Sequence, residues 1–297
     1  KKITQNFNTV ILHANNDFDL INFEQIYILI SIIIMKYPKK VSKYIVDWLS
    51  NYLINSKNKG FVVGVSGGID SAVTSKLCAL SGFPVYIIEM PINQEKSQVA
   101  RAKEHMKLLK NEFSNVTSIT TSLTNVFDTL KNELKKHEKG ELNKHSLANT
   151  RARLRMTTLY YYAGHYESLV VGTGNKVEDF GIGFYTKYGD GGVDLSPIAD
   201  LLKSDVFSLG KFLKINGQIL NAKPTDGLWD DNRTDEDQMG IGYDEIEEAM
   251  NLITKKIPDK ELSIDQIKSR KIYKNLNKQN RHKMRPIPVC KVPVNLL

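Results

Sequence analysis

The fold class is decided at Phe61-Val62-Val63-Gly64-Val65-Ser66-Gly67-Gly68-Ile69-Asp70-Ser71, where an apolar run meets two glycines and a carboxylate. Residues 61–65 are mostly aromatic or β-branched, the composition of a strand buried on both faces in a parallel sheet. Gly67 and Gly68 let the backbone turn sharply and present N–H groups to an anion. From Ser71 onward, apolar residues at helical spacing predict a helix, whose N-terminus also attracts negative charge. The stretch therefore predicts a strand, an anion-binding turn and a helix.

Asp70 lies inside this predicted phosphate cradle, where a carboxylate alone would repel the ligand. Mg²⁺ removes such a repulsion, because it commonly joins one or two carboxylates to phosphate oxygens. The Walker phosphate loop is excluded, since its last glycine is followed by a lysine that is missing here. The stretch instead resembles the signature of the ATP pyrophosphatases, which split ATP into AMP and pyrophosphate. That resemblance implies that ATP is bound by Gly64, Val65, Ser66, Gly67, Gly68, Ile69, Asp70 and Ser71.

The composition is that of an ordinary globular protein, with 41% hydrophobic and 25% charged residues in 297. A net charge of +8 suits either nucleic acid or polyanionic nucleotides as partners. Because the lysines are dispersed, we interpret the excess as solvated surface and predict no nucleic-acid partner. Cys78 and Cys290 lack the spacing of a zinc site or a disulfide scaffold. This cysteine usage predicts a cytoplasmic localisation.

The first 34 residues differ from the rest of the chain in composition. Their apolar run, residues 26–34, is about half as long as a membrane-spanning helix requires. No secretory signal is recognisable either, because acidic residues precede the run and no cleavage site follows. We predict no membrane association. We expect the native protein to begin at Met35, residues 1–34 to be a leader or non-native segment, and residues 35–297 to form a single domain.

Strand and helix patterns alternate through the next part of the chain. Apolar runs predict strands at 61–65, 85–90, 116–120 and 169–171. Helical spacing predicts helices at 41–53, 71–80, 94–109, 123–136 and about 146–163. This alternation predicts a Rossmann-like α/β fold, a parallel sheet with helices on both faces and ligands at the carboxyl ends of the strands.

Two further segments carry candidate site residues. The segment Asn149-Thr150-Arg151-Ala152-Arg153-Leu154-Arg155-Met156 places three arginines at alternate helical positions. Residues two positions apart on a helix point about 200° away from each other, so the three arginines cannot all face one site. The segment 171–179 ends a strand with glycines and adds Thr173 and Glu178, candidates for nucleotide and Mg²⁺ contacts. An ordinary helix N-terminus explains these acidic residues equally well.

The loop at 181–194 makes a family resemblance specific. It contains Thr186-Lys187-Tyr188-Gly189-Asp190-Gly191-Gly192-Val193-Asp194, a polar, glycine-rich sequence suited to substrate capture. Together with the loop at 61–71, the arginine segment and the Gly-Thr-x-x-x-x-Glu pattern, it resembles the NAD synthetases from about Val41 to the C-terminus. One departure lies between Glu178 and Lys187, where this chain is one residue longer than the family pattern.

The resemblance implies a role for each matching position. Asp70 and Glu178 would hold Mg²⁺. The ATP site would be completed by Thr173, Lys203 and Thr225. Deamido-NAD would be bound by Asn149, Arg153, Lys187, Asp194, His282 and Lys283. Asp190 and Lys203 would be the catalytic residues, with Asp190 facing the incoming ammonia. The resemblance also implies a homodimer that binds substrate near its interface.

The implied reaction is the ATP-dependent amidation of deamido-NAD to NAD by ammonia. A carboxylate resists ammonia because its leaving group would be oxide, so it must first be activated as an acyl adenylate. We expect free ammonia as the nitrogen source, because the residues before Phe61 are too few for a glutaminase domain. The alternatives are a tRNA-modifying adenylating enzyme of the same superfamily and a non-catalytic nucleotide-binding module. A thiolating member of the former would need a poised cysteine, which neither Cys78 nor Cys290 resembles.

Overall fold

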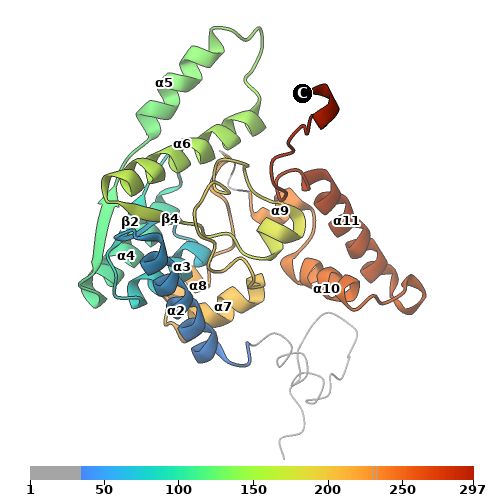
Figure 1. The fold of residues 1–297 in the computed structure, drawn as a ribbon, viewed down its shortest axis with the longest axis horizontal. Helices are drawn as coiled ribbons and strands as arrows, with labels where there is room; N and C mark the ends of the chain where they lie inside the picture. The colour runs from blue at the N-terminus through green and yellow to red at the C-terminus, as the bar shows by residue number, and fades with distance from the viewer. Residues whose placement is uncertain (1–34, 230, 232) are drawn as a thin grey trace, which may run out of the picture.

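Four parallel strands form one sheet at the centre of the computed structural model, which describes residues 35–229, 231 and 233–297 (Figure 1). Their spatial order is β3-β2-β1-β4. The strands are β1 (Gly60–Gly64), β2 (Val85–Glu89), β3 (Val116–Thr120) and β4 (Ser168–Val171). The predicted parallel α/β fold is confirmed. The predictions for residues 1–34 lie outside the described residues, and the single domain stays a prediction.

Helices cover both faces of the sheet. Side chains point alternately to the two faces along each strand, so apolar residues on both faces need to be buried. In β1, Phe61 and Val63 pack in one core and Val62 in the other. The first face is covered by α2 (Pro38–Ser56), α3 (Ile69–Leu80), α4 (Lys96–Glu112) and α7 (Lys203–Phe212). The second face is covered by α5 (Thr124–Lys135) and α6 (Lys144–His165).

A third apolar cluster lies beside the carboxyl ends of the strands. It joins η1 (Val177–Ile182) to α9 (Asp235–Met239), α10 (Tyr243–Thr254) and α11 (Ile264–Asn280). Figure 1 shows α10 and α11 side by side, away from the sheet. The remaining short helices are α8 (Gly217–Leu220), η2 (Asp259–Glu261) and η3 (Val294–Leu296). No helix of the described residues is long and apolar enough to cross a membrane.

The predicted elements up to residue 165 agree with the structure within a few residues, whereas the helices after residue 200 were not predicted. The segment η1 is a π-helix, the form in which a helix takes up one extra residue. It contains Glu178 and sets the position of that residue.

Candidate active site

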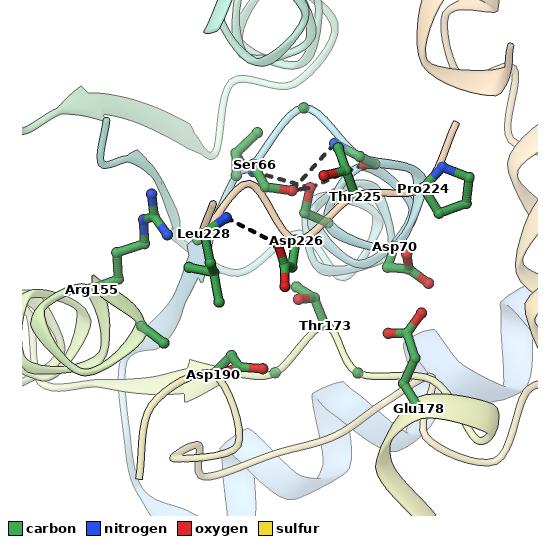
Figure 2. A pocket seen from close by; sticks show the side chains of 18 of the residues that line it. Ser66, Asp70, Arg155, Thr173, Glu178, Asp190, Pro224, Thr225, Asp226 and Leu228 are labelled. Carbon is green, nitrogen blue, oxygen red and sulfur yellow. Dashed lines mark hydrogen bonds between the residues drawn. The ribbon is translucent and has the colours of Figure 1, made fainter. Parts of the chain in front are cut away.

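One pocket opens at the carboxyl ends of β1, β2 and β4, where a parallel sheet is expected to bind its ligand (Figure 2). All eight residues predicted to bind ATP in the loop at 64–71 line it, and so do Thr173, Lys203 and Thr225. Glu178 and Asp190 line it as well. Tertiary structure therefore brings the predicted ATP, metal and ammonia residues together from segments more than 150 residues apart.

The turn between β1 and α3 is stabilised by its own hydroxyl groups. The Ser66 N–H donates to Ser71 Oγ at 3.2 Å, and the Gly68 N–H donates to Ser66 Oγ at 3.2 Å. Gly67 has a φ of +85°, and a Cβ there would lie 2.5 Å from the Gln98 carbonyl oxygen. Only glycine combines this left-handed conformation with so close a contact. The turn thus places N–H groups and the N-terminus of α3 beside the pocket.

Lys203, the first residue of α7, links the two predicted metal ligands. Its Nζ lies 2.6 Å from Asp70 Oδ2 and 2.9 Å from Glu178 Oε1, and its side chain is only 4% exposed. Figure 2 shows the Asp70 and Glu178 carboxylates facing each other across the pocket. The ammonium group therefore neutralises part of a buried pair of negative charges.

The electrostatics of this triad follow from burial and contact. Burial would lower the pKa of Lys203, but attraction to Asp70 and Glu178 outweighs it and raises that pKa above its ordinary value. For Glu178, burial alone would raise the pKa, and the Lys203 charge and the Tyr243 hydrogen bond lower it. Burial dominates at Asp70 and raises its pKa. Because Lys203 contacts both carboxylates, the charge state of each group affects the other two.

Tyr243 and Asp235 extend the triad and were missed by the sequence analysis. The Tyr243 hydroxyl donates to Glu178 Oε1 at 2.5 Å and lies 3.2 Å from Asp235 Oδ2. The Lys203 ammonium lies 4.9 Å from the centre of the Tyr243 ring. Burial, followed by the Glu178 charge, raises the pKa of Asp235 to about 7. No local pattern marks these two residues, because only the packing of α9 and α10 against η1 brings them here.

Asn175 was also missed, although it stands within a segment that the sequence analysis had singled out. Its Nδ2 donates to Asp70 Oδ1 at 3.0 Å, and its Oδ1 accepts from the Val177 and Glu178 N–H groups. One amide therefore orients both predicted metal ligands.

The donor set fits Mg²⁺. The carboxylates of Asp70 and Glu178 supply oxygen donors, and the bonds described for Glu178 all fall on Oε1. Two carboxylates are the usual protein share of a Mg²⁺ site that also uses phosphate oxygens. No group of three or more metal-binding side chains occurs among the described residues.

Asp190 lies across the pocket from the triad, in the glycine-rich loop. Its Oδ1 accepts from the Thr186 N–H at 3.0 Å. Part of the residue is open to solvent. The protein atoms around its carboxylate nevertheless exclude much of the water, and this desolvation raises the pKa of Asp190 to about 6. The glycines of the loop allow close packing on α6, since a Cβ on Gly189 would lie 2.9 Å from Ala152 Cβ.

The six residues predicted to bind deamido-NAD lie outside the lining of this pocket. Their polar groups engage the chain itself. Arg153 Nη2 donates to the Lys187 carbonyl at 3.3 Å, and Lys187 Nζ donates to the His282 carbonyl at 2.9 Å. Asn149 Oδ1 accepts from Thr186 Oγ1 at 2.6 Å. Asp194 accepts from the Tyr160 hydroxyl and the Val170 N–H, at 2.9 and 2.8 Å.

Side chains from the end of α11 donate to consecutive carbonyls that lead into the glycine-rich loop. Asn277 donates to the Gly181 carbonyl at 2.7 Å, and Asn280 donates to the Ile182 carbonyl at 2.9 Å. Lys283 Nζ then donates to the carbonyls of Gly183 and Tyr185. We name these three side chains the α11 ladder. It fixes the segment between Glu178 and Asp190 to the C-terminal helix.

Comparison with known proteins agrees with this geometry. The NAD synthase family model matches residues 41–287. The chain is 36% identical over 258 residues to the NH(3)-dependent NAD(+) synthetase of Archaeoglobus fulgidus, which covers 86% of this chain and 97% of that relative. Among solved structures, the NMN synthetase from Francisella tularensis superposes with a TM-score of 0.75 at 32% identity, covering 86% of this chain and 99% of the other. The NH3-dependent NAD synthetase from Campylobacter jejuni gives a TM-score of 0.68 at 25% identity over the same shares. The chain therefore belongs to the NAD synthase family, and the resemblance predicted from its motifs is confirmed.

Proposed function

We propose that this protein catalyses the amidation of deamido-NAD to NAD by ammonia, with ATP converted to AMP and pyrophosphate. The observation that carries the proposal is the convergence of a phosphate-binding turn, the Lys203 triad and Asp190 in one pocket of an NAD synthase fold. The tRNA-modifying alternative gains no support from the family match. Its thiolating form also lacks a suitable cysteine. Cys78 is buried in α3, where burial raises the pKa of its thiol, and Cys290 is exposed and does not line the pocket.

In the first step, the nicotinate carboxylate attacks the α-phosphorus of ATP and pyrophosphate leaves. The N–H groups of the turn at 66–71, with Thr173 and Thr225, would bind the phosphates, since these residues line the pocket. The Lys203 ammonium would stabilise the charge on the departing pyrophosphate. Asp70 and Glu178 would hold Mg²⁺, which supplies further neutralisation of the triphosphate when bound.

In the second step, ammonia adds to the carbonyl of the acyl adenylate and AMP leaves. Most ammonia is protonated in neutral water and carries no free electron pair. Asp190, with a pKa of about 6, is ionised at neutral pH and able to accept a proton from the incoming ammonium. Its place on the opposite side of the pocket from the triad separates proton transfer from pyrophosphate departure (Figure 2).

We further propose a homodimer with α5 and α6 at its interface. On α5, Val126, Leu130 and Leu134 form an exposed stripe at a spacing of four residues. On α6, Tyr161 is 67% exposed. Exposed apolar stripes of this kind are typical of interaction surfaces. Asn149 and Arg153, the α6 residues assigned to deamido-NAD, would then lie close to the interface.

A second candidate substrate is nicotinate mononucleotide. The solved structure of an NMN synthetase resembles this chain, and the residues assigned to the dinucleotide lie outside the pocket, where their polar groups bond to the chain itself. A mononucleotide would need only the pocket itself. The reaction chemistry and the roles of Lys203 and Asp190 would be the same for both substrates.

The test is to incubate the protein with ATP, Mg²⁺ and ammonium, together with either deamido-NAD or nicotinate mononucleotide. We expect AMP and pyrophosphate with NAD from the first, and the ratio of the two kcat/KM values identifies the preferred substrate. Glutamine at the same concentration should not replace ammonium. Absence of an amide product from both nucleotides would refute the proposed function.

A further inference from the structure

The strongest unexplained feature of the pocket is a buried nitrogen atom without a hydrogen-bond partner. Among the described residues, the buried side-chain atoms without a partner belong to Thr74, Glu89, Arg155 and Asp235. Only Arg155 and Asp235 of these line the pocket, and only Arg155 is a cation. An unpaired buried donor is costly, so it is expected to bond to a water molecule, an ion or a ligand.

Arg155 stands on the face of α6 that forms one wall of the pocket. Ala152, Arg155, Met156 and Leu159 all line the pocket, at the spacing that places helical residues on one face. The Arg155 Nε donates to the Met90 carbonyl at 3.1 Å, just beyond the end of β2. This bond fixes the guanidinium group and leaves Nη2 buried and unpaired.

The two neighbouring arginines have other contacts. Arg151 Nη1 donates to the Leu228 carbonyl at 2.7 Å, and its guanidinium lies 4.4 Å from the centre of the Phe127 ring. Arg153 is exposed and donates to the Lys187 carbonyl. Of the three arginines of this segment, Arg155 is the one that lines the pocket.

The charges around Arg155 show that it is a cation at one end of the pocket. Asp190 and Asp226 are the carboxylates whose charges act on Arg155. Burial, followed by the Arg151 charge, lowers the pKa of Arg155 to about 10, so it remains a cation at neutral pH. Figure 2 shows Arg155 on the far side of Asp226 from Asp70 and Glu178. Arg155 therefore lies at the end of the pocket away from the two carboxylates that contact Lys203.

We propose that Arg155 is a substrate-binding residue whose guanidinium group donates to an anionic oxygen of the reacting nucleotides, either the α-phosphate of ATP or the nicotinate carboxylate. The inference rests on the proposed function, because that reaction brings these two anions into contact. A guanidinium group held between apolar side chains offsets the repulsion between these two anions more than a solvated cation does. In this proposal Lys203 stabilises the charge of the departing pyrophosphate, and Arg155 stabilises the charge of the anions between which the new bond forms.

The test measures binding of each nucleotide separately by isothermal titration calorimetry. The ligands are ATP with Mg²⁺ and deamido-NAD without ATP. The proteins are the wild type, Arg155→Met, which keeps an unbranched stem, and Arg155→Lys, which keeps the charge but not the fork. Lys110→Met, on the exposed end of α4, is the control for loss of one positive charge. Melting temperatures report whether each variant folds.

We expect Arg155→Met to raise the Kd of one ligand by about 10- to 100-fold, the usual effect of losing a charged hydrogen bond, with less than about 3-fold for the other. The ligand that is weakened is the one whose anion Arg155 binds. Arg155→Lys should fall between the wild type and Arg155→Met, and Lys110→Met should match the wild type.

Unchanged Kd values for both ligands in a folded Arg155→Met protein would overturn the proposal. Equal weakening of both ligands with a lowered melting temperature would also overturn it, because Arg155 would then act on the fold. Failure of the proposed function is a separate result. A wild type that binds both ligands but forms no amide would refute the function and leave the binding comparison valid.

Discussion

At the residue scale, the structure turns two predicted metal ligands into a triad with a buried lysine. A buried ion pair gains its attraction at the cost of desolvation, so its net contribution to stability is small. Removing one partner is different, because the remaining charges stay buried without compensation. Lys203 faces two carboxylates, so its loss should have the largest effect in the triad.

We expect Lys203→Met to abolish NAD formation and to lower the free energy of unfolding by about 3–5 kcal/mol. The methionine fills the same volume but leaves Asp70 and Glu178 facing each other. Urea denaturation at neutral pH measures the loss. Lys211→Met, an exposed site on the same helix, should change stability by less than about 0.5 kcal/mol. Equal stability of the two variants would contradict the electrostatic account.

Asp190→Asn tests the second step of the reaction. The amide keeps the shape of the side chain but cannot accept a proton, so amide formation should slow by about 10²–10⁴-fold. Formation of the acyl adenylate should be spared. Rapid-quench detection of the adenylate and of NAD separates the two steps, and an equal loss of both would show that Asp190 binds substrate or orders its loop.

The pH dependence follows from the same carboxyl group. Because its pKa is raised to about 6, Asp190 is protonated below that pH and ionised above it. The wild-type rate of the second step should therefore rise as pH increases through about 6, and rise further where free ammonia becomes more abundant. Asp190→Asn should lose the first rise and keep the second. A profile of the variant that still shows the rise near pH 6 would assign it to another group.

At the scale of elements, the C-terminal helix controls the loop that carries Asp190. The α11 ladder places one donor beside each of three consecutive carbonyls, at a spacing of three residues along the chain. This spacing keeps the side chains on one face of a helix and its continuation. The loop is therefore positioned by side chains that lie 96 to 100 residues further along the chain than the carbonyls they contact.

The double variant Asn277→Ala with Asn280→Ala should lower the free energy of unfolding by about 1–3 kcal/mol, since two hydrogen bonds are lost. It should also raise KM for the nicotinate nucleotide more than KM for ATP. Lys274→Ala, exposed on the same helix, is the control. Amide exchange across residues 181–185 should be faster in the double variant. Unchanged exchange would mean that the loop holds its conformation without the ladder.

At the scale of the whole molecule, the exposed apolar residues of α5 are the feature on which the proposed homodimer rests. The buried side of this helix packs through Phe127, and the exposed apolar stripe runs alongside that buried side. A free monomer would present that stripe to water, at a cost proportional to its area.

We expect the wild type to sediment as a dimer and Leu130→Glu to sediment as a monomer, because a charge would be buried in the interface. Asn132→Glu, which points elsewhere on the same helix, should stay dimeric. Analytical ultracentrifugation distinguishes these states. Wild-type protein that is monomeric at micromolar concentration would refute an α5 interface.

The sequence by itself determined the sheet, the phosphate-binding turn and the family. Each of these features depends on residues that are close together in the chain. Apolar periodicity marks a strand such as β1, and glycines within the run from Gly64 to Ser71 mark the turn, where Gly67 adopts a positive φ. Asp70 and Glu178 became candidates in the same way, because each follows a strand and a glycine-rich turn, whereas the role predicted for Asp190 came from the family resemblance.

Only the tertiary structure decided which of these residues meet and what completes them. Lys203 pairs with Asp70 across 133 positions, and Tyr243 reaches Glu178 across 65. No local pattern encodes such contacts, because they arise when α7 and α10 pack against the sheet and η1. The structure also distinguished the three arginines: Arg153 is turned by about 200° from the other two, and of the three only Arg155 lines the pocket. Periodicity reports which side of an element is apolar, whereas a site formed by distant elements depends on how those sides pack together.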